Sequence, residues 1–310
     1  MATTVKRPSA GASKAPAAKS KATTTKSTAA KATKATAAKD GDAQSSFERM
    51  LGLLDLFTPS AAVRPVADLV NYLGTSRSTS YRYIKALHAA GLIEAVANGG
   101  YVLGPRIVEF DRQIRMSDPL YKGGAPVLRS LAEVTGHSAL LCALYSDSVM
   151  CIRDELASGS PMTLFSRGQR RPLFSGAASK IILPYLPPHR LRSIFTQHQR
   201  NIAVAGLGTD WQGFRDNLAA IRRDGYIMTH GEFNPGVFGI SAPVLNADGL
   251  VVGSIGIAGS EDRLDRRKLP AYFEAVVGAG KRLSELLAHE NSDLVRPPRA
   301  FGSVSARTGR

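Results

Sequence analysis

The amino-acid sequence predicts an α+β protein, in which a small helical region precedes a larger region of mixed strands and helices. Apolar residues recur at helical spacing through much of residues 47–91. Residues 92–104 then alternate around an Asn-Gly-Gly turn, which is typical of a two-stranded hairpin. From about residue 136 onwards, apolar β-like runs are separated by helical segments. This order favours an antiparallel sheet with helices grouped around it.

The composition is that of a globular protein with an anionic partner. Its 310 residues are 44% hydrophobic, which is enough for two domains with buried cores. The net charge of +15 and the sequence pI of about 10.1 favour a partner such as nucleic acid. No stretch reaches the roughly 18 uncharged apolar residues of a membrane span, and the start of the chain lacks the apolar core of a secretory signal. We therefore expect a cytoplasmic protein without membrane association.

The two cysteines, Cys142 and Cys151, are too few for a disulfide framework. They have no cluster of cysteines and histidines at metal-ligand spacing beside them. We interpret both as buried, reduced thiols. We expect neither a metal site nor another cofactor.

The first 44 residues are rich in Lys, Ala and Thr and have almost no large apolar side chains. Such a segment cannot bury enough surface to offset the entropy of ordering, so we expect disorder here and in residues 291–310. Residues 1–45 carry nine basic and two acidic side chains. They could follow DNA phosphates without reading bases, or serve only as a solubilising extension. An organellar transit peptide is a third interpretation, although such peptides are usually richer in arginine.

Three predicted helices and a hairpin follow in residues 45–105. The segment FERMLGLLDLF has an apolar stripe and is stopped by Pro59. The segment RPVADLVNYLG is a second helix that closes at Gly74. The third helix has Ser76 as its N-cap and stops at Gly91. Together with the hairpin, this order is typical of a winged helix-turn-helix domain.

The third predicted helix, in GTSRSTSYRYIKALHAAGL, has few apolar residues. At 3.6 residues per turn, Ser80, Ile84 and Leu87 share one face, which the other two helices can cover. The opposite arc has three cations and no acid, so it suits the phosphates and base edges of a DNA major groove. A solvated basic face on an ordinary helix is the alternative. The predicted DNA contacts are Arg77, Ser78, Thr79, Tyr81, Arg82 and Lys85.

Residues 106–135 are predicted to form linker helices. Ile107, Phe110 and Ile114 fall at helical spacing, and Asp118 with the proline that follows it is typical of a helix start. An apolar stripe on such a helix commonly pairs across a dimer. Packing onto its own chain is the alternative.

The region of residues 136–290 is predicted to contain both strands and helices. The expected strands are SALLCALY, VMCIRDEL, PMTLFSR, GISAPVL and LVVGSIGIA, of which the last two are joined by a turn at Asn246, Asp248 and Gly249. The expected helices are GAASKIILPYL, PPHRLRSIF, DWQGFRDNLAAIRRDG and a last one over residues 266–289.

Several motifs together resemble the IclR family of bacterial transcriptional regulators over roughly residues 45–290. They are TSRSTSYRYIKALHAAGLIE and GGYVLGPRIVEF in the first region, and GQRRPLFSGAASKIILPYLP, IRRDGY and FNPGVFGISAPVLNADGLVVGSIGIAG in the second. The resemblance implies a winged helix-turn-helix domain, a linker helix and a C-terminal effector domain of GAF-like fold. It also implies a homodimer or tetramer whose binding to a palindromic operator is modulated by a small molecule.

The resemblance further implies an effector cavity beside the helix start after RPL, the loop before PGV and the paired final strands. Where family members often have Asp, Cys and two serines, this chain has Thr229, Gly239, Gly256 and Ala258. We therefore expect a less polar, roomier cavity that takes an aromatic or other hydrophobic carboxylic acid. Backbone amides at the start of GAASK could hold its carboxylate. The residues implied at the cavity are Met162, Leu164, Ser175, Gly176, Ala177, Ala178, Thr229, Val237, Gly239, Gly256 and Ala258.

The sequence offers only weak candidates for a catalytic site. Ser179 and Lys180 are neighbours on a predicted helix, so their side chains point about 100° apart and cannot form a dyad. Neither a G-x-S-x-G elbow nor a P-loop occurs. We interpret His137 as a core or loop residue and Glu232 as a surface carboxylate. The prediction is a DNA-binding regulator and no enzyme; a nucleoid-type DNA binder without effector and an enzyme of GAF-like fold are the alternatives.

Overall fold

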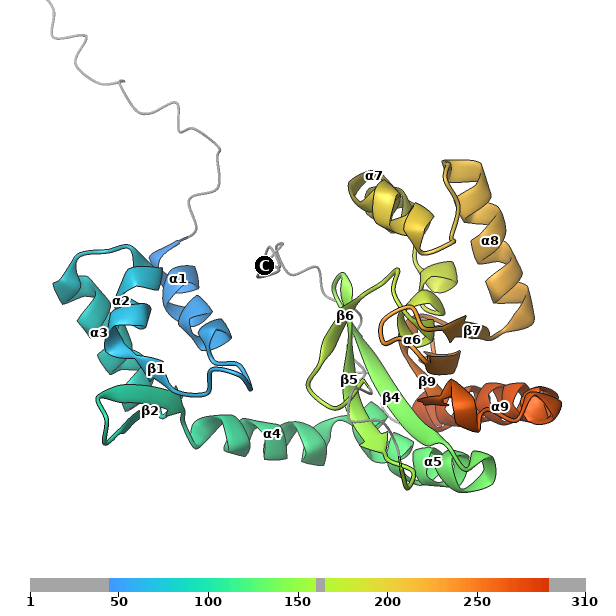
Figure 1. Cartoon of the computed structure of the whole chain (residues 1–310), viewed down its shortest axis with the longest axis horizontal. Coiled ribbons are helices and arrows are strands. Elements are labelled where there is room, and N and C mark those ends of the chain that lie inside the picture. Colours follow the sequence, from blue (N-terminus) through green and yellow to red (C-terminus); the bar gives the residue numbers. More distant parts are fainter. Residues whose placement is uncertain (1–44, 160–164, 290–310) are drawn as a thin grey trace, which may run out of the picture. The chain divides into compact units, whose positions relative to one another are not determined.

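The computed structural model describes residues 45–159 and 165–289, whose strands form two separate antiparallel sheets (Figure 1). The smaller sheet has the strand order β1-β3-β2. The larger sheet has the order β6-β5-β4-β9-β8-β7. The predicted α+β class is confirmed. The segments predicted to be disordered, 1–44 and 291–310, lie outside the described residues.

The N-terminal region has three helices and a hairpin, as predicted. Its elements are α1 (Ser46–Gly52), the 3-10 helix η1 (Leu53–Leu56), β1 (Arg64–Pro65), α2 (Val66–Leu73), α3 (Arg77–Ala89), β2 (Ile93–Val96) and β3 (Gly100–Leu103). The first helix ends earlier than predicted, because its last turn tightens into η1 ahead of Pro59. Strand β1 was not predicted, since it exists only through pairing of Arg64 with Tyr101.

Apolar side chains from η1, α2, α3 and β2 form the core of this region. Leu53, Leu69 and Leu73 contact Ile84 and Leu87 of α3, and each of these five is at most 2% exposed. The buried face predicted for α3 is therefore confirmed. Burying it leaves the other side of the helix outside this core.

The start of α3 depends on Ser76. Its Oγ accepts a hydrogen bond from the backbone N–H of Thr79 at 3.3 Å, which confirms the predicted N-cap. Replacing Ser76 with alanine should lower the free energy of unfolding by about 1 kcal/mol, because that N–H loses its acceptor. Urea unfolding followed by circular dichroism measures this change. Ser78→Ala removes an exposed hydroxyl from the same turn and should change stability by less than about 0.5 kcal/mol; equal losses in the two variants would contradict the capping role.

The predicted linker helices are α4 (Arg106–Ser117) and α5 (Pro119–Thr135). Asp118 caps α5, since its Oδ1 accepts a hydrogen bond from the backbone N–H of Tyr121 at 3.0 Å. No residue of α4 is buried, and Phe110 and Ile114 are 40% and 51% exposed. The described part of the chain therefore does not cover the apolar stripe of α4.

The larger sheet combines four predicted strands with two short ones. Its strands are β4 (Ser138–Tyr145), β5 (Ser148–Glu155), β6 (Arg170–Pro172), β7 (Ile227–His230), β8 (Val237–Leu245) and β9 (Val251–Ser260). The predicted turn at residues 246–249 joins β8 to β9. The strand predicted over PMTLFSR lies mostly outside the described residues, and residues 165–167 are not a strand. The edge strands β6 and β7 were missed, because they are too short for a period-two pattern.

Helices of the larger region are α6 (Ala177–Lys180), η2 (Leu183–Tyr185), α7 (Pro188–Val204), α8 (Trp211–Asp224), η3 (Glu261–Arg263), η4 (Arg266–Lys268) and α9 (Leu269–His289). The helix predicted in GAASKIILPYL is a single α-helical turn followed by η2. Pro184 lacks the N–H that a continuing α-helix needs. Helix α7 is longer than predicted and has non-helical backbone angles at His198.

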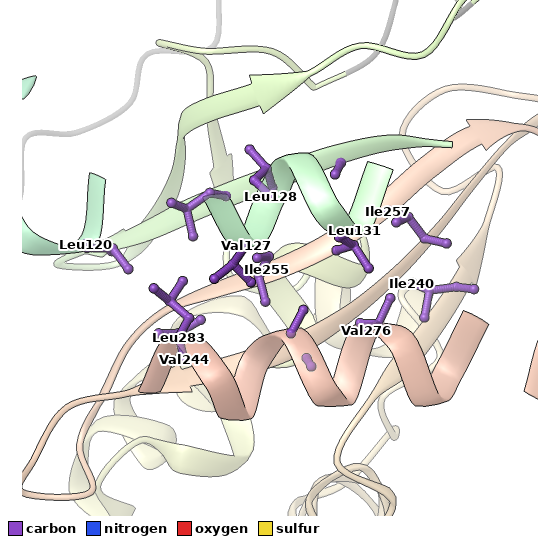
Figure 2. Close-up of a cluster of buried hydrophobic side chains, with 14 of the residues drawn as sticks. Leu120, Val127, Leu128, Leu131, Ile240, Val244, Ile255, Ile257, Val276 and Leu283 are labelled. Atoms are coloured by element: carbon purple, nitrogen blue, oxygen red, sulfur yellow. The ribbon is translucent and has the colours of Figure 1, made fainter. Parts of the chain in front are cut away.

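Two cores lie on opposite faces of the larger sheet. Leu141 belongs to the core that β8 and β9 share with α5 and α9, and Figure 2 shows Leu128 of α5 and Val276 of α9 in it. Leu140 and Cys142 point the other way, into a second core with residues of α7 and α8. Figure 1 shows these two helices and α6 across the sheet from α5 and α9.

Cys142 and Cys151 lie opposite each other on β4 and β5 and are both free and buried, as predicted. A hydrogen bond with the Cys142 thiol, together with burial, raises the pKa of the Cys151 thiol far above its usual range. Cys151 therefore stays protonated and unreactive at neutral pH. None of the helices in residues 45–159 and 165–289 has the length and apolarity to cross a membrane.

Candidate functional site

The face of α3 opposite the core is exposed and basic. The helix contains no acidic residue, so no carboxylate of its own neutralises its arginines. Thr79 is half-buried, and both its N–H and its Oγ1 contact the Ser76 hydroxyl. The exposed side chains on this face are Arg77, Ser78, Tyr81, Arg82 and Lys85.

Two arginines of α3 lie beside tyrosine rings. The Cζ of Arg77 lies 5.8 Å from the ring centroid of Tyr81, and the Cζ of Arg82 lies 5.9 Å from that of Tyr83. Such contacts orient a guanidinium through its face and leave its N–H edge for in-plane acceptors. The arrangement can contact phosphate oxygens and base edges at the same time.

A cavity of about 50 Å³ lies in the larger region, between α6, the inner side of the sheet and the loop that precedes β8. Ser175 does not line it, and its backbone N–H donates to the carbonyl of Pro172 in the turn before α6. Met162 and Leu164 lie outside the described residues. The implied effector residues that do line the cavity are Gly176, Ala177, Ala178, Thr229, Val237, Gly239 and Ala258.

Gly256 was also expected at the cavity and does not line it. It pairs with Ser241 across β8 and β9, and a Cβ at Gly256 would collide with the Ser241 side chain and with the carbonyl oxygen of Ile240. Ser241 lines the cavity in its place. We expected extra room in the cavity because glycine stands at position 256 where relatives often have serine. The Ser241 side chain already fills that room, and it supplies a hydroxyl to the cavity.

Glu232 and Lys180 form an ion pair beside the cavity. The Lys180 side chain is 3% exposed, and its Nζ donates to Glu232 Oε1 and to the carbonyl of Ala205. Glu232 is 26% exposed and lines the cavity. Glu232 is therefore an exposed carboxylate, as we interpreted it, but it also pairs with a buried lysine that is distant in sequence. Ser179 Oγ has no hydrogen-bond partner among the described residues, and no serine–lysine dyad forms there.

The backbone amides at the start of α6 are already bonded to side chains of the chain itself. Gly176 N–H donates to Glu232 Oε2 at 3.0 Å, and Ala177 N–H donates to Thr229 Oγ1 at 3.2 Å. In this conformation these two amides are therefore not free for a ligand carboxylate, and their role in binding stays a prediction. A charged donor that lines the cavity could take that role if an acid binds here.

Arg171 lines the cavity, and the sequence reasoning missed it. Its Cζ lies 4.2 Å from the ring centroid of Phe165 and 3.8 Å from that of Phe233. Burial lowers the pKa of Arg171 to about 10, which still leaves it protonated at neutral pH. The adjacent arginines Arg170 and Arg171 could have indicated a basic side chain at the cavity. Neighbouring residues on a strand point to opposite faces of the sheet, so one of the two faces inward.

Comparisons with known proteins cover both regions. The family model for the IclR helix-turn-helix domain matches residues 46–97, and the model for the C-terminal part of the bacterial transcriptional regulator IclR matches residues 116–285. The HTH-type transcriptional regulator KipR of Bacillus subtilis is 24% identical over 242 residues, which cover 78% of this chain and 96% of KipR. Such relatives are named as transcriptional regulators and not as enzymes.

Solved structures show the same fold. An IclR transcriptional regulator from Alicyclobacillus acidocaldarius has a TM-score of 0.66 at 20% identity, covering 78% of this chain and 98% of its own. An IclR homologue from Microbacterium hydrocarbonoxydans, solved in complex with 4-hydroxybenzoate, has a TM-score of 0.63 at 17% identity, covering 78% and 99%. Since the C-terminal family model alone matches more than half of the residues, the chain belongs to the IclR family of bacterial transcriptional regulators.

Proposed function

We propose that the protein binds a palindromic operator in double-stranded DNA, and that a hydrophobic carboxylic acid modulates this binding. The DNA-binding domain would span residues 45–105, linker helices residues 106–135 and the effector domain residues 136–290. The observation that carries the proposal is the exposed, acid-free cationic face of α3 within the matched helix-turn-helix region. A protein acting on the bacterial genome in this way works in the cytoplasm, on the nucleoid.

The roles on α3 follow from the chemistry of each side chain. Arg82 has a planar fork of donors that matches the two acceptors of a guanine edge, and Lys85 supplies a point charge for phosphate. Tyr81 is 46% exposed and offers a hydroxyl from the same face. Arg77, Ser78 and Thr79 stand at the helix start, where they would contact the backbone of the duplex.

A homodimer or tetramer would present two such helices to the two halves of a palindrome. The uncovered stripe of α4, with Phe110 and Ile114 exposed, supports an association through this helix. Burying these side chains against a second copy would remove their apolar surface from water. The linker would then carry a change in the effector domain to the paired DNA-binding domains.

An aromatic or other hydrophobic carboxylic acid is the proposed effector. The cavity walls include Leu140, Ala177 and Val237, and a basic side chain, Arg171, lies among them. The homologue that was solved with 4-hydroxybenzoate binds an acid of this class. The acid would change DNA binding only as far as it binds two arrangements of the protein with different affinity.

Selection of bound genomic fragments tests the proposal. The full chain should recover fragments that share an inverted repeat, and genes beside that repeat should concern the metabolism of the effector. Aromatic and aliphatic acids would then be titrated against the protein–operator complex, and an aromatic acid should change the affinity for the operator. Fragments without a common sequence would instead support a nucleoid-type binder whose main contact is the basic segment 1–44.

A further inference from the structure

We propose that Arg171 receives the carboxylate of the effector and thereby makes the cavity selective for monocarboxylates with a flat apolar body. This assignment rests on the proposed function, because it names a residue and a ligand class for the same cavity. Arg171 is not among the cavity residues that the family resemblance implied. Four features of the structure support it: strand register, an unpaired donor, the aromatic neighbours and the charge of the cavity.

Strand register turns Arg171 inward. On β6 it pairs with Val149 of β5, so the two side chains lie on the same face of the sheet. Val149 is fully buried in the second core, which places Arg171 on the inner face. Arg170, its neighbour, points the other way and is exposed. The chain therefore directs one of two adjacent arginines toward the cavity.

The guanidinium of Arg171 has no anionic partner in the part of the chain that the structure describes. None of the ion pairs there includes Arg171. Its Nε is buried and has no hydrogen-bond acceptor among the same residues. A buried donor without an acceptor lowers stability, and a ligand carboxylate would supply the missing acceptor.

Two aromatic rings hold this guanidinium by its faces. Phe165 and Phe233 approach Cζ at 4.2 and 3.8 Å from their centroids. Contacts of this kind leave the N–H groups, which lie in the guanidinium plane, directed at in-plane acceptors. A carboxylate matches that edge with two parallel hydrogen bonds, which a neutral amide cannot do with its single oxygen.

The charges around the cavity favour a monoanion. Glu232 is neutralised by Lys180, whereas Arg171 adds one positive charge that nothing balances among the described residues. Arg171 remains protonated at neutral pH even though burial lowers its pKa to about 10. One carboxylate would neutralise the cavity. A second carboxylate would face the Glu232 oxygens and an apolar wall without a cation.

Phe233 marks where the flat body of the ligand would lie. The present cavity of about 50 Å³ is well below the roughly 300 Å³ of small ligand pockets, so a side chain must leave when an aromatic acid enters. Phe233 is 52% exposed and lies between Gly231 and Gly236, both of which have positive φ. Its ring covers one face of Arg171, where the ring of the ligand could stack in its place.

Isothermal titration calorimetry of the full chain tests this assignment with 4-hydroxybenzoate and its amide, 4-hydroxybenzamide, as probes. The wild-type protein should bind the acid about tenfold or more tightly than the amide. Arg171→Gln should lower the affinity for the acid by about tenfold or more and change that for the amide by less than about twofold. Arg170→Gln is the matched control on the same strand and should leave both affinities as they are. Unfolding and operator binding show whether Arg171→Gln is folded.

If Arg171→Gln does not fold, the comparison of acid and amide on the wild-type protein still decides, and equal affinities would overturn the assignment. Unchanged affinity of a folded Arg171→Gln for the acid would also overturn it, while leaving the proposed regulator intact. Binding of the wild-type protein to the aromatic and aliphatic acids would also be measured, benzoate and 4-hydroxybenzoate among them. If it binds none of them, both the assignment and the proposed effector class are overturned. Operator recognition through α3 would be judged separately, by the recovered fragments.

Discussion

Replacing Arg82 with glutamate is expected to lower the affinity for the operator by about 100-fold or more. The variant loses the donor fork that we propose reads base edges, and it would bring a carboxylate against the phosphates. Arg82 is exposed on α3 and takes no part in the core of Ile84 and Leu87, so the fold should be retained. Fluorescence anisotropy with the recovered operator, at fixed salt, measures the loss.

Two further variants of this chain test whether the loss of affinity comes from the α3 face. Arg223→Glu reverses an exposed charge on α8, outside the proposed interface, and should bind the operator as the wild type does. Deletion of residues 1–44 should mainly reduce the dependence of binding on salt, because basic segments contact phosphates without regard to sequence. Retained operator preference in Arg82→Glu, together with loss of binding on deletion, would contradict recognition by α3 and support the nucleoid-type alternative.

Replacing Glu232 with alanine is expected to lower the free energy of unfolding by about 3 kcal/mol, since Lys180 would remain buried without a counter-charge. The backbone N–H of Gly176 would lose its acceptor as well. A loss of this size corresponds to a drop in melting temperature of about 10 °C for a region of this length. Calorimetric or fluorescence-monitored thermal unfolding of the full chain provides the measurement.

A double variant and a surface control separate the ion pair from a general effect of charge removal. Lys180→Met with Glu232→Leu removes both charges and should recover most of the lost stability. Glu261→Ala breaks the exposed pair with His230 and should cost less than about 1 kcal/mol. If the double variant were less stable than Glu232→Ala, the buried ammonium would not be the cause of the loss.

Elements held by neighbouring residues could be predicted accurately. Helix α3 begins at Ser76, and its buried face at Ile84 and Leu87 follows from the helical period, since capping and amphipathicity act within a few residues. The hairpin of β2 and β3 and the cap of α5 at Asp118 are confirmed for the same reason. Short edge strands such as β1 and β7 were missed, because their existence depends on partners far along the chain.

The cavity shows the same difference between what neighbouring residues determine and what distant partners determine. Family resemblance placed Thr229, Val237 and Gly239 near it, and these residues do line it. It gave no reason to choose Arg171, since only pairing with β5 decides which of two adjacent arginines faces inward. Nothing in the sequence indicated that Glu232, an exposed carboxylate as expected, pairs with Lys180.

By itself, the sequence determined that this protein has a capped, acid-free third helix, a hairpin after it and an α+β region in its C-terminal part. These features arise from contacts within a few residues, so composition and period are sufficient to reveal them. Only the tertiary structure decided that Glu232 neutralises Lys180 and that the Nε of Arg171 has no acceptor among the described residues. Such pairings join strands and loops distant in sequence, and the burial that gives them their energy exists only once the chain has folded.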